Sequence, residues 1–162
     1  MVRRLIVMRH CKSSWADAEQ TDHQRPLNDR GRRDAPQVAR ALAARDWIPE
    51  FILSSDSLRT RETCELMRQA WETEIETDFV RGLYQAGVED LRRALPCVPH
   101  ETSCLLLLGH NPGWEQVVFR LCQEQLVMKT GTAVLLQSDC QKWTDALNSR
   151  WLLVEAIHPR EL

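Results

Sequence analysis

Arginine and histidine residues in three separate places along the chain have the side chains needed to bind a multiply charged anion. Arg9 and His10 follow a short apolar run, Arg59 lies just beyond a second run, and His110 follows a third. If the ends of these runs converge, two guanidiniums and two imidazoles surround one point. Such an arrangement is costly to assemble unless an anion neutralises it. A phosphoryl group is therefore the natural ligand of this site.

The apolar runs that precede these residues are typical of buried strands. Residues 5–8, 51–53 and 104–108 are short and rich in strand formers, and we expect further strands at 75–77, 133–136 and 151–154. Helical spacing of apolar residues predicts helices at 29–45, from 54–56 to 71, at 88–95, and from Pro112 onward. Pro36 predicts an entry turn or a kink in the first helix. This alternation favours an α/β layered fold with a mainly parallel sheet, whose ligands bind at the carboxyl ends of the strands.

The length and composition fit one domain spanning residues 1–162. The 162 residues are 43% hydrophobic and 27% charged, and the net charge is only −2 with the two signs interspersed. This balance argues against a broad basic surface for nucleic acid or anionic lipid. The apolar stretch after Arg4 is too short for a signal peptide or a membrane span, so we expect a cytoplasmic protein. Six scattered cysteines without a Cys-x-x-Cys pair predict neither disulfides nor a zinc site.

Four segments, in this order, resemble the signature of the histidine phosphatase superfamily, and within it the phosphohistidine phosphatases similar to SixA. Residues 8–15 resemble the opening Arg-His motif, and residues 25–31 resemble the segment that follows it. Residues 54–63 resemble the second-arginine motif, and residues 109–113 the second-histidine motif. The resemblance covers nearly the whole chain and implies a three-layer α/β/α sandwich of the phosphoglycerate mutase-like type.

The resemblance also implies roles for individual residues. His10 attacks phosphorus in line, Arg9, Arg59 and His110 hold the non-bridging oxygens, and water resolves the phosphohistidine intermediate to release phosphate ion. Arg25 is a further candidate for binding phosphate. The loop that it starts either lines the pocket, where Arg25 would reach the phosphate, or only covers the sheet. Phosphoryl transfer needs fixed positive charge around the equatorial oxygens, and forked guanidiniums supply it better than ammoniums do.

The proton positions follow from this division of roles. The attacking nitrogen of His10 must be neutral, so its other ring nitrogen needs an acceptor, for which a backbone carbonyl is the expected group. His110 is better suited as a donor, and its protonation depends on the bound anion. The mechanism uses no cofactor and no metal, so we expect the activity to survive a chelator.

A missing carboxylate bears on the substrate. Where phosphomutase-like and many phosphomonoesterase relatives carry a glutamate acid, residues 81–86 of this chain contain no carboxylate. An alkoxide leaving group needs a proton, whereas an imidazole leaves readily once its own ring is protonated. The absence favours a phosphohistidine-bearing signalling or phosphotransfer protein over small phosphorylated substrates. Asp78 and Glu89 flank the segment and stay open as candidate acids.

Other interpretations remain at this level. The chain is alternatively a general small-molecule phosphomonoesterase of the same superfamily, or a catalytically silent phosphate-binding module. Cys11, which follows His10 where many members have glycine, is either a small packing residue or a redox-sensitive thiol beside a cationic site. We expect Trp15 and Trp114 to flank the mouth of the pocket.

Overall fold

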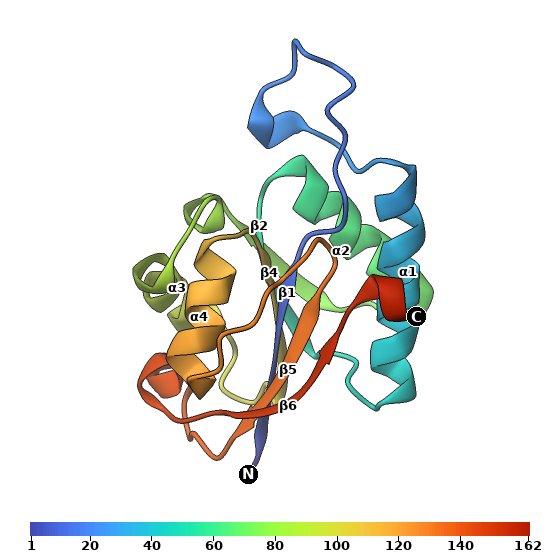
Figure 1. The fold of residues 1–162 in the computed structure, drawn as a ribbon. Coiled ribbons are helices and arrows are strands. Elements are labelled where there is room, and N and C mark those ends of the chain that lie inside the picture. The colour runs from blue at the N-terminus through green and yellow to red at the C-terminus, as the bar shows by residue number, and fades with distance from the viewer.

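The computed structural model describes all 162 residues, and its centre is one six-stranded sheet (Figure 1). The strand order is β3-β2-β4-β1-β5-β6, in which β1, β2, β3 and β4 pair in parallel while β5 and β6 pair antiparallel. The strands are β1 (Arg3–Arg9), β2 (Phe51–Ser55), β3 (Glu76–Val80), β4 (Cys104–Gly109), β5 (Ala133–Ser138) and β6 (Leu152–Ile157). The prediction of a mainly parallel sheet is confirmed.

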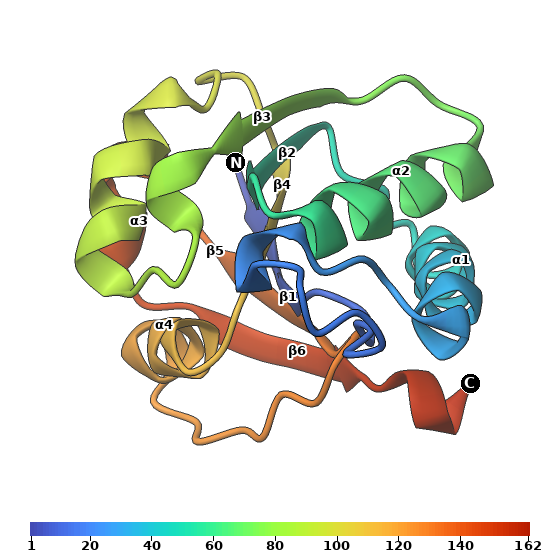
Figure 2. The same ribbon diagram turned by 90° about the horizontal axis from the view of Figure 1, so that it is seen from above.

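Helices cover both faces of this sheet and complete an α/β/α arrangement of three layers (Figure 2). One face carries α1 and α2, and the other carries α3 and α4. The helices are α1 (Asp29–Ala44), α2 (Leu58–Trp71), α3 (Val88–Ala94) and α4 (Gly113–Cys122). Because all six strands belong to one sheet, we infer that residues 1–162 form one domain. None of the helices has the length and apolar character needed to cross a membrane.

The alternating side chains of β1 explain why its sequence is apolar without interruption. Successive side chains of a strand point to opposite faces, so a strand covered on both faces buries all of them. Leu5 and Val7 pack in the cluster that includes Trp114 of α4, whereas Ile6 and Met8 pack in the cluster beneath α1 and α2. The run of four leucines in β4 is buried in the same way.

Three details of the elements differ from the sequence-based expectation. The helix α1 runs from Asp29 to Ala44 with Pro36 in its interior, so the helix does not begin with an entry turn at the proline. The cap of α2 is Ser57, whose hydroxyl accepts a hydrogen bond from the backbone N–H of Thr60, because β2 continues to Ser55 and uses residues 54 and 55 as strand. Trp114 is fully buried, so the expectation that it flanks the pocket mouth is wrong.

The carboxyl ends of β1, β2 and β4 meet at one edge of the sheet, where the parallel register aligns Arg9 with Gly109 and Ser54 with Leu108. The loop of residues 11–28 projects beyond this edge, as the blue segment at the top of Figure 1 shows, and lies over the end of β1 in Figure 2. Its only regular structure is a short 3-10 turn (Asp22–Gln24) and an isolated bridge between Ser13 and Leu27. The loop and the strand ends together form the candidate site.

Candidate active site

His10 is held in a single orientation at the end of β1. Its backbone N–H donates to the carbonyl of Gly109 at 3.0 Å, and its Nδ1 lies 2.6 Å from the carbonyl oxygen of Cys11. A carbonyl only accepts, so Nδ1 carries the proton and Nε2 presents its lone pair. Burial lowers the pKa of His10 well below its usual value, and the nearby His110, Arg59 and Arg9 lower it further, against the raising effect of the Cys11 carbonyl. The expected carbonyl acceptor is confirmed, and the His10 ring is neutral with the lone pair on Nε2.

Arg59 lies in the first turn of α2 and connects three parts of the site. Its Nε donates to Nε2 of His10 at 3.3 Å, while Nη1 and Nη2 donate to the carbonyl (2.6 Å) and carboxylate (3.0 Å) of Asp22. Its side chain is 6% exposed. The guanidinium fork is therefore fixed in the plane that brings its Nε against Nε2 of His10.

His110 follows β4, and its ring centroid lies 5.2 Å from that of His10. Nη2 of Arg59 approaches its Nδ1 at 3.4 Å, and Nε2 lies 2.8 Å from the hydroxyl of Ser55. Because a guanidinium only donates, Nδ1 accepts and the proton lies on Nε2. Burial lowers the pKa of His110 to about 3, and the charge of Arg59 adds to this effect. Without an anion His110 is neutral.

Arg9, the last residue of β1, lines the same cavity as His10 and Arg59. Its Nη1 donates to the carbonyl of Met128 at 3.1 Å, whereas its Nε is buried without a hydrogen-bond acceptor in the protein. A buried donor without a partner is rare in folded proteins, and it fits a site that binds an anion.

Asp22 and Tyr84 belong to the site although the sequence did not single them out. The carboxylate of Asp22 accepts from Nε of Arg25 at 3.0 Å, from Nη2 of Arg59, and from the hydroxyl of Tyr84. Burial raises the pKa of Asp22, but the hydrogen bonds from Tyr84 and Arg59 outweigh burial and lower it to about 2. The spacing Asp22-x-x-Arg25 was the one available signal, because side chains three residues apart meet across a helical turn.

Arg25 reaches the cavity wall from the same loop. It is 7% exposed, donates to the hydroxyl of Ser13 at 2.9 Å, and lies with its guanidinium carbon 3.4 Å from the ring centroid of Trp15. The Trp15 side chain is 72% exposed, so this tryptophan flanks the mouth as expected.

All five predicted site residues line one cavity of about 250 Å³. Its twelve lining residues are Arg9, His10, Lys12, Ser13, Trp15, Asp22, Arg25, Arg59, Gln85, His110, Asn111 and Thr130. The candidate acids lie elsewhere: the side chain of Glu89 is 69% exposed and pairs with Arg92, and Asp78 lies beside the Cys97 thiol. Asp22 is the single carboxylate in the lining.

The structure favours the packing interpretation of Cys11. Its side chain is fully buried, and burial raises the pKa of its thiol to about 12, with a smaller contribution from Asp34. Its backbone N–H donates to the hydroxyl of Thr63 at 3.2 Å, which in turn donates to the Arg59 carbonyl at 2.7 Å. A thiol with this pKa is not a reactive thiolate at neutral pH. Cys11 instead links the loop that follows His10 to α2.

The chain is similar in sequence and in structure to known proteins. The sequence model described as Histidine phosphatase superfamily (branch 1) matches residues 5–79. An uncharacterized chloroplastic protein of Arabidopsis thaliana is 36% identical over 153 residues, covering 89% of this chain and 70% of the relative. The chain belongs to the histidine phosphatase superfamily. It is a phosphatase.

This chain is also similar to a mycobacterial protein and to two solved SixA structures. An uncharacterized Mycobacterium tuberculosis protein is 31% identical over 107 residues, covering 65% of this chain and 63% of the relative. SixA from Agrobacterium tumefaciens is 26% identical with a TM-score of 0.83, covering 97% of this chain and 98% of that chain. SixA from Nakamurella multipartitia has a TM-score of 0.88 at 23% identity, covering 98% and 97%. The fold of this histidine phosphatase is thus SixA-like and phosphoglycerate mutase-like.

Metal ligands are not gathered anywhere in the structure, since no three His, Cys, Asp or Glu side chains form a group that could hold a metal ion. The expectation that catalysis needs no metal and no cofactor stays a prediction, which a chelator tests. The cytoplasmic location expected from the sequence also stays a prediction.

Proposed function

We propose that this phosphatase hydrolyses phosphohistidine on a signalling or phosphotransfer protein, with His10 as the nucleophile. Arg9, Arg59 and His110 bind the phosphoryl oxygens, and Arg25 completes the wall of the phosphate site. The observation that carries the proposal is the tautomer of His10. Its Nδ1–H donates to the Cys11 carbonyl, and its unprotonated Nε2 accepts from Nε of Arg59 at 3.3 Å.

In the first step Nε2 of His10 forms a bond to phosphorus while the bond from phosphorus to the substrate nitrogen breaks. His10 keeps its proton on Nδ1, so the phosphorylated ring is an imidazolium whose charge the Cys11 carbonyl stabilises. The substrate imidazole leaves as a neutral ring, because its other nitrogen is protonated beforehand. Fixed guanidiniums offset the charge on the transferring group.

In the second step water attacks phosphorus and the bond to Nε2 of His10 breaks. The electron pair returns to Nε2, and the ring becomes neutral again. Inorganic phosphate leaves with one proton of the attacking water, and the other proton passes to solvent. The low pKa of His10 favours this step, since a less basic imidazole is a better leaving group.

The choice of phosphohistidine over phosphate esters is supported by the state of Asp22. This carboxylate titrates at about 2 and accepts hydrogen bonds from Arg25, Arg59 and Tyr84, so it has no proton to donate at neutral pH. An alkoxide leaving group would need such a proton, whereas a protonated phosphohistidine ring does not. A protein histidine phosphatase SixA in complex with tungstate has the same fold, with a TM-score of 0.80 at 18% identity over 98% of each chain.

The test is the release of phosphate from a phosphohistidine-bearing phosphotransfer domain, measured beside p-nitrophenyl phosphate. We expect fast release from the domain, slow hydrolysis of the ester, and loss of both in His10→Ala. His100→Ala is the matched control, because His100 lies outside the cavity. Fast ester hydrolysis would instead favour a general phosphomonoesterase, and the absence of His10-dependent turnover on either substrate would refute the proposed nucleophile.

A further inference from the structure

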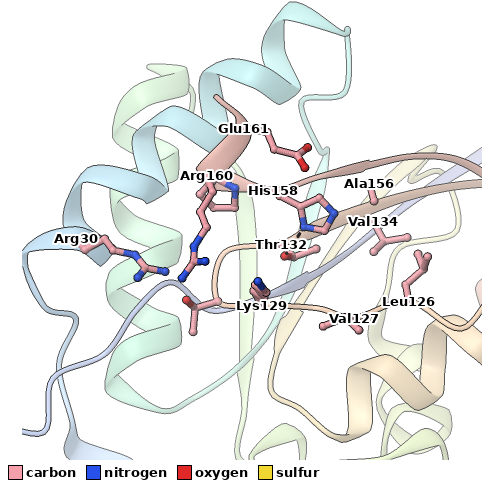
Figure 3. Close-up of a pocket in the computed structure, with 12 residues that line it drawn as sticks. Arg30, Leu126, Val127, Lys129, Thr132, Val134, Ala156, His158, Arg160 and Glu161 are labelled. Atoms are coloured by element: carbon pink, nitrogen blue, oxygen red, sulfur yellow. Dashed lines mark hydrogen bonds between the residues drawn. The ribbon is translucent and has the colours of Figure 1, made fainter.

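A second cavity, of about 350 Å³, is drawn in Figure 3. Its walls come from α1, from the segment that precedes β5, and from the chain after β6. Thr130 lines both cavities, so the two are neighbours on one continuous surface. Of the charged residues around this second cavity, only Arg30 lies within one of the sequence motifs, and none was a predicted site residue.

The sheet register sets the spacing of the strand ends that carry the two cavities. Met8 of β1 pairs with Ala133 of β5, and Ala133 pairs with Ile157 of β6. The ends of β1 and β6 are therefore two strand spacings apart, which is about 10 Å. The backbone N–H of Arg9 also donates to the carbonyl of Thr132 at 3.1 Å, which fixes the cavity floor to the catalytic strand.

One half of the second cavity is cationic. Arg30, Lys129 and Arg160 line it, and in Figure 3 the guanidiniums of Arg30 and Arg160 point into the same space. Arg30 has one ion pair, with Asp34 at 3.6 Å, while Lys129 and Arg160 have none. The lining contains one carboxylate, Glu161, which points away from both guanidiniums. Like charges that converge in this way are complementary to an anionic group.

The other half of the cavity is apolar. Leu126, Val127, Val134 and Ala156 line it, and the Val127 side chain is 69% exposed. His158 lies between the two halves and is hydrogen-bonded through Nδ1 to the hydroxyl of Thr132 at 3.0 Å. A ligand that fills both halves combines a negative charge with an apolar group.

We propose that the second cavity binds an acidic side chain and an adjacent apolar side chain of the phosphoprotein substrate. This inference rests on the proposed function and names the surface that the substrate protein presents. The distance of about 10 Å corresponds to about three residues of extended chain, at roughly 3.3 Å each. The acidic residue therefore lies about three positions from the phosphohistidine in an extended segment.

The experiment compares synthetic phosphohistidine peptides that carry Asp-Leu or Ala-Ala three residues before or after the phosphohistidine. We expect wild type to show a kcat/KM about tenfold higher for an Asp-Leu peptide, a preference that weakens as salt is added. The double variant Arg30→Ala, Arg160→Ala should reduce the preference to less than about threefold while leaving the Ala-Ala peptide and p-nitrophenyl phosphate unchanged. Arg40→Ala, on an exposed part of α1 outside both cavities, should keep the full preference.

Two results would overturn the docking site. One is that wild type has the same kcat/KM on the Asp-Leu and Ala-Ala peptides. The other is that the double variant loses the same factor in kcat/KM on both kinds of peptide. Binding of the unphosphorylated Asp-Leu peptide to wild type, measured by fluorescence anisotropy, separates this inference from the proposed function. If no phosphohistidine peptide is hydrolysed but the double variant weakens this binding at least fivefold, the docking site stands and the proposed substrate is wrong.

Discussion

At the residue scale, the neighbours of His10 allow one tautomer of its ring, and the proposed chemistry depends on that tautomer. The Cys11 carbonyl takes the Nδ1 proton, and Arg59 approaches Nε2 with a donor. The sequence predicted a backbone carbonyl as the acceptor for His10. It also predicted that Arg59 lies near His10, because both residues follow buried strands and parallel strands bring their ends together. Asp22 and Tyr84 were missed because they come from irregular segments, whose positions no hydrophobic period reports.

Replacing Arg59 with lysine tests the importance of the guanidinium fork. A lysine keeps the positive charge, but its single nitrogen cannot reach His10 and both oxygen acceptors of Asp22 at once. We expect kcat/KM for a phosphohistidine substrate to fall on the order of 100-fold, as for the loss of one transition-state donor.

The control for this change is Arg61→Lys, in the same turn of α2. Arg61 donates to the Asp56 carbonyl outside the cavity, so its replacement should change kcat/KM less than about twofold. Retention of a third or more of the activity in Arg59→Lys would contradict the role assigned to the fork.

At the element scale, the sequence predicted every strand and helix to within a few residues, because both kinds of element show their own apolar spacing. The path of the loop at residues 11–28 was not predictable, since it has no regular repeat. Its position depends on close contacts such as that of Gly31 in α1 with Lys12. A Cβ on Gly31 would lie 2.2 Å from the Lys12 carbonyl oxygen.

Gly31→Ala should therefore damage both stability and catalysis. The new methyl group meets the backbone of Lys12, two residues after His10, so α1 and the loop must move apart. We expect a loss of about 1–3 kcal/mol in the free energy of unfolding, and a reduced kcat. Urea unfolding and phosphate release measure the two effects.

Gly82→Ala is the matched control for this substitution. Its nearest contact is Cγ1 of Val80 at 3.9 Å, so a methyl group fits there without displacement. If Gly31→Ala were no less stable than Gly82→Ala, the packing of α1 on the catalytic loop would not be what holds the loop in place.

At the scale of the whole molecule, folding assembles cations and neutral histidines at one end of the sheet. This gathering has an energetic cost that depends on pH, because both His10 and His110 have pKa values below those of exposed histidine. The sequence predicted that this end of the sheet binds an anion. It did not predict the second cavity, whose cations Arg30, Lys129 and Arg160 come from distant parts of the chain and form no motif.

The free energy of unfolding should decrease as the pH falls below about 6.5. In this range the unfolded chain protonates both histidines, whereas the folded protein does not protonate His110 until about pH 3. Each histidine contributes a slope of up to about 1.4 kcal/mol per pH unit. The Asp22 carboxylate adds a loss only below its unfolded pKa, as the pH falls towards its folded value of about 2.

Urea unfolding of wild type and His110→Asn between pH 7.5 and 4.5 measures this dependence. The variant should lose less stability on acidification than wild type, and His100→Asn should behave like wild type. Stability of wild type that stays constant between pH 7 and 5 would show that the two histidines are not buried in their neutral form.

The most direct test of the central claim is to trap the phosphorylated enzyme and identify the phosphorylated nitrogen. Wild type mixed with a phosphohistidine substrate and quenched in base within milliseconds should carry one phosphoryl group on Nε2 of His10, read by peptide mapping and 31P NMR. His10→Ala should carry none. A phosphoryl group on Nδ1 or on another residue would contradict the account, because the Cys11 carbonyl reserves Nδ1 for its proton and leaves Nε2 to attack.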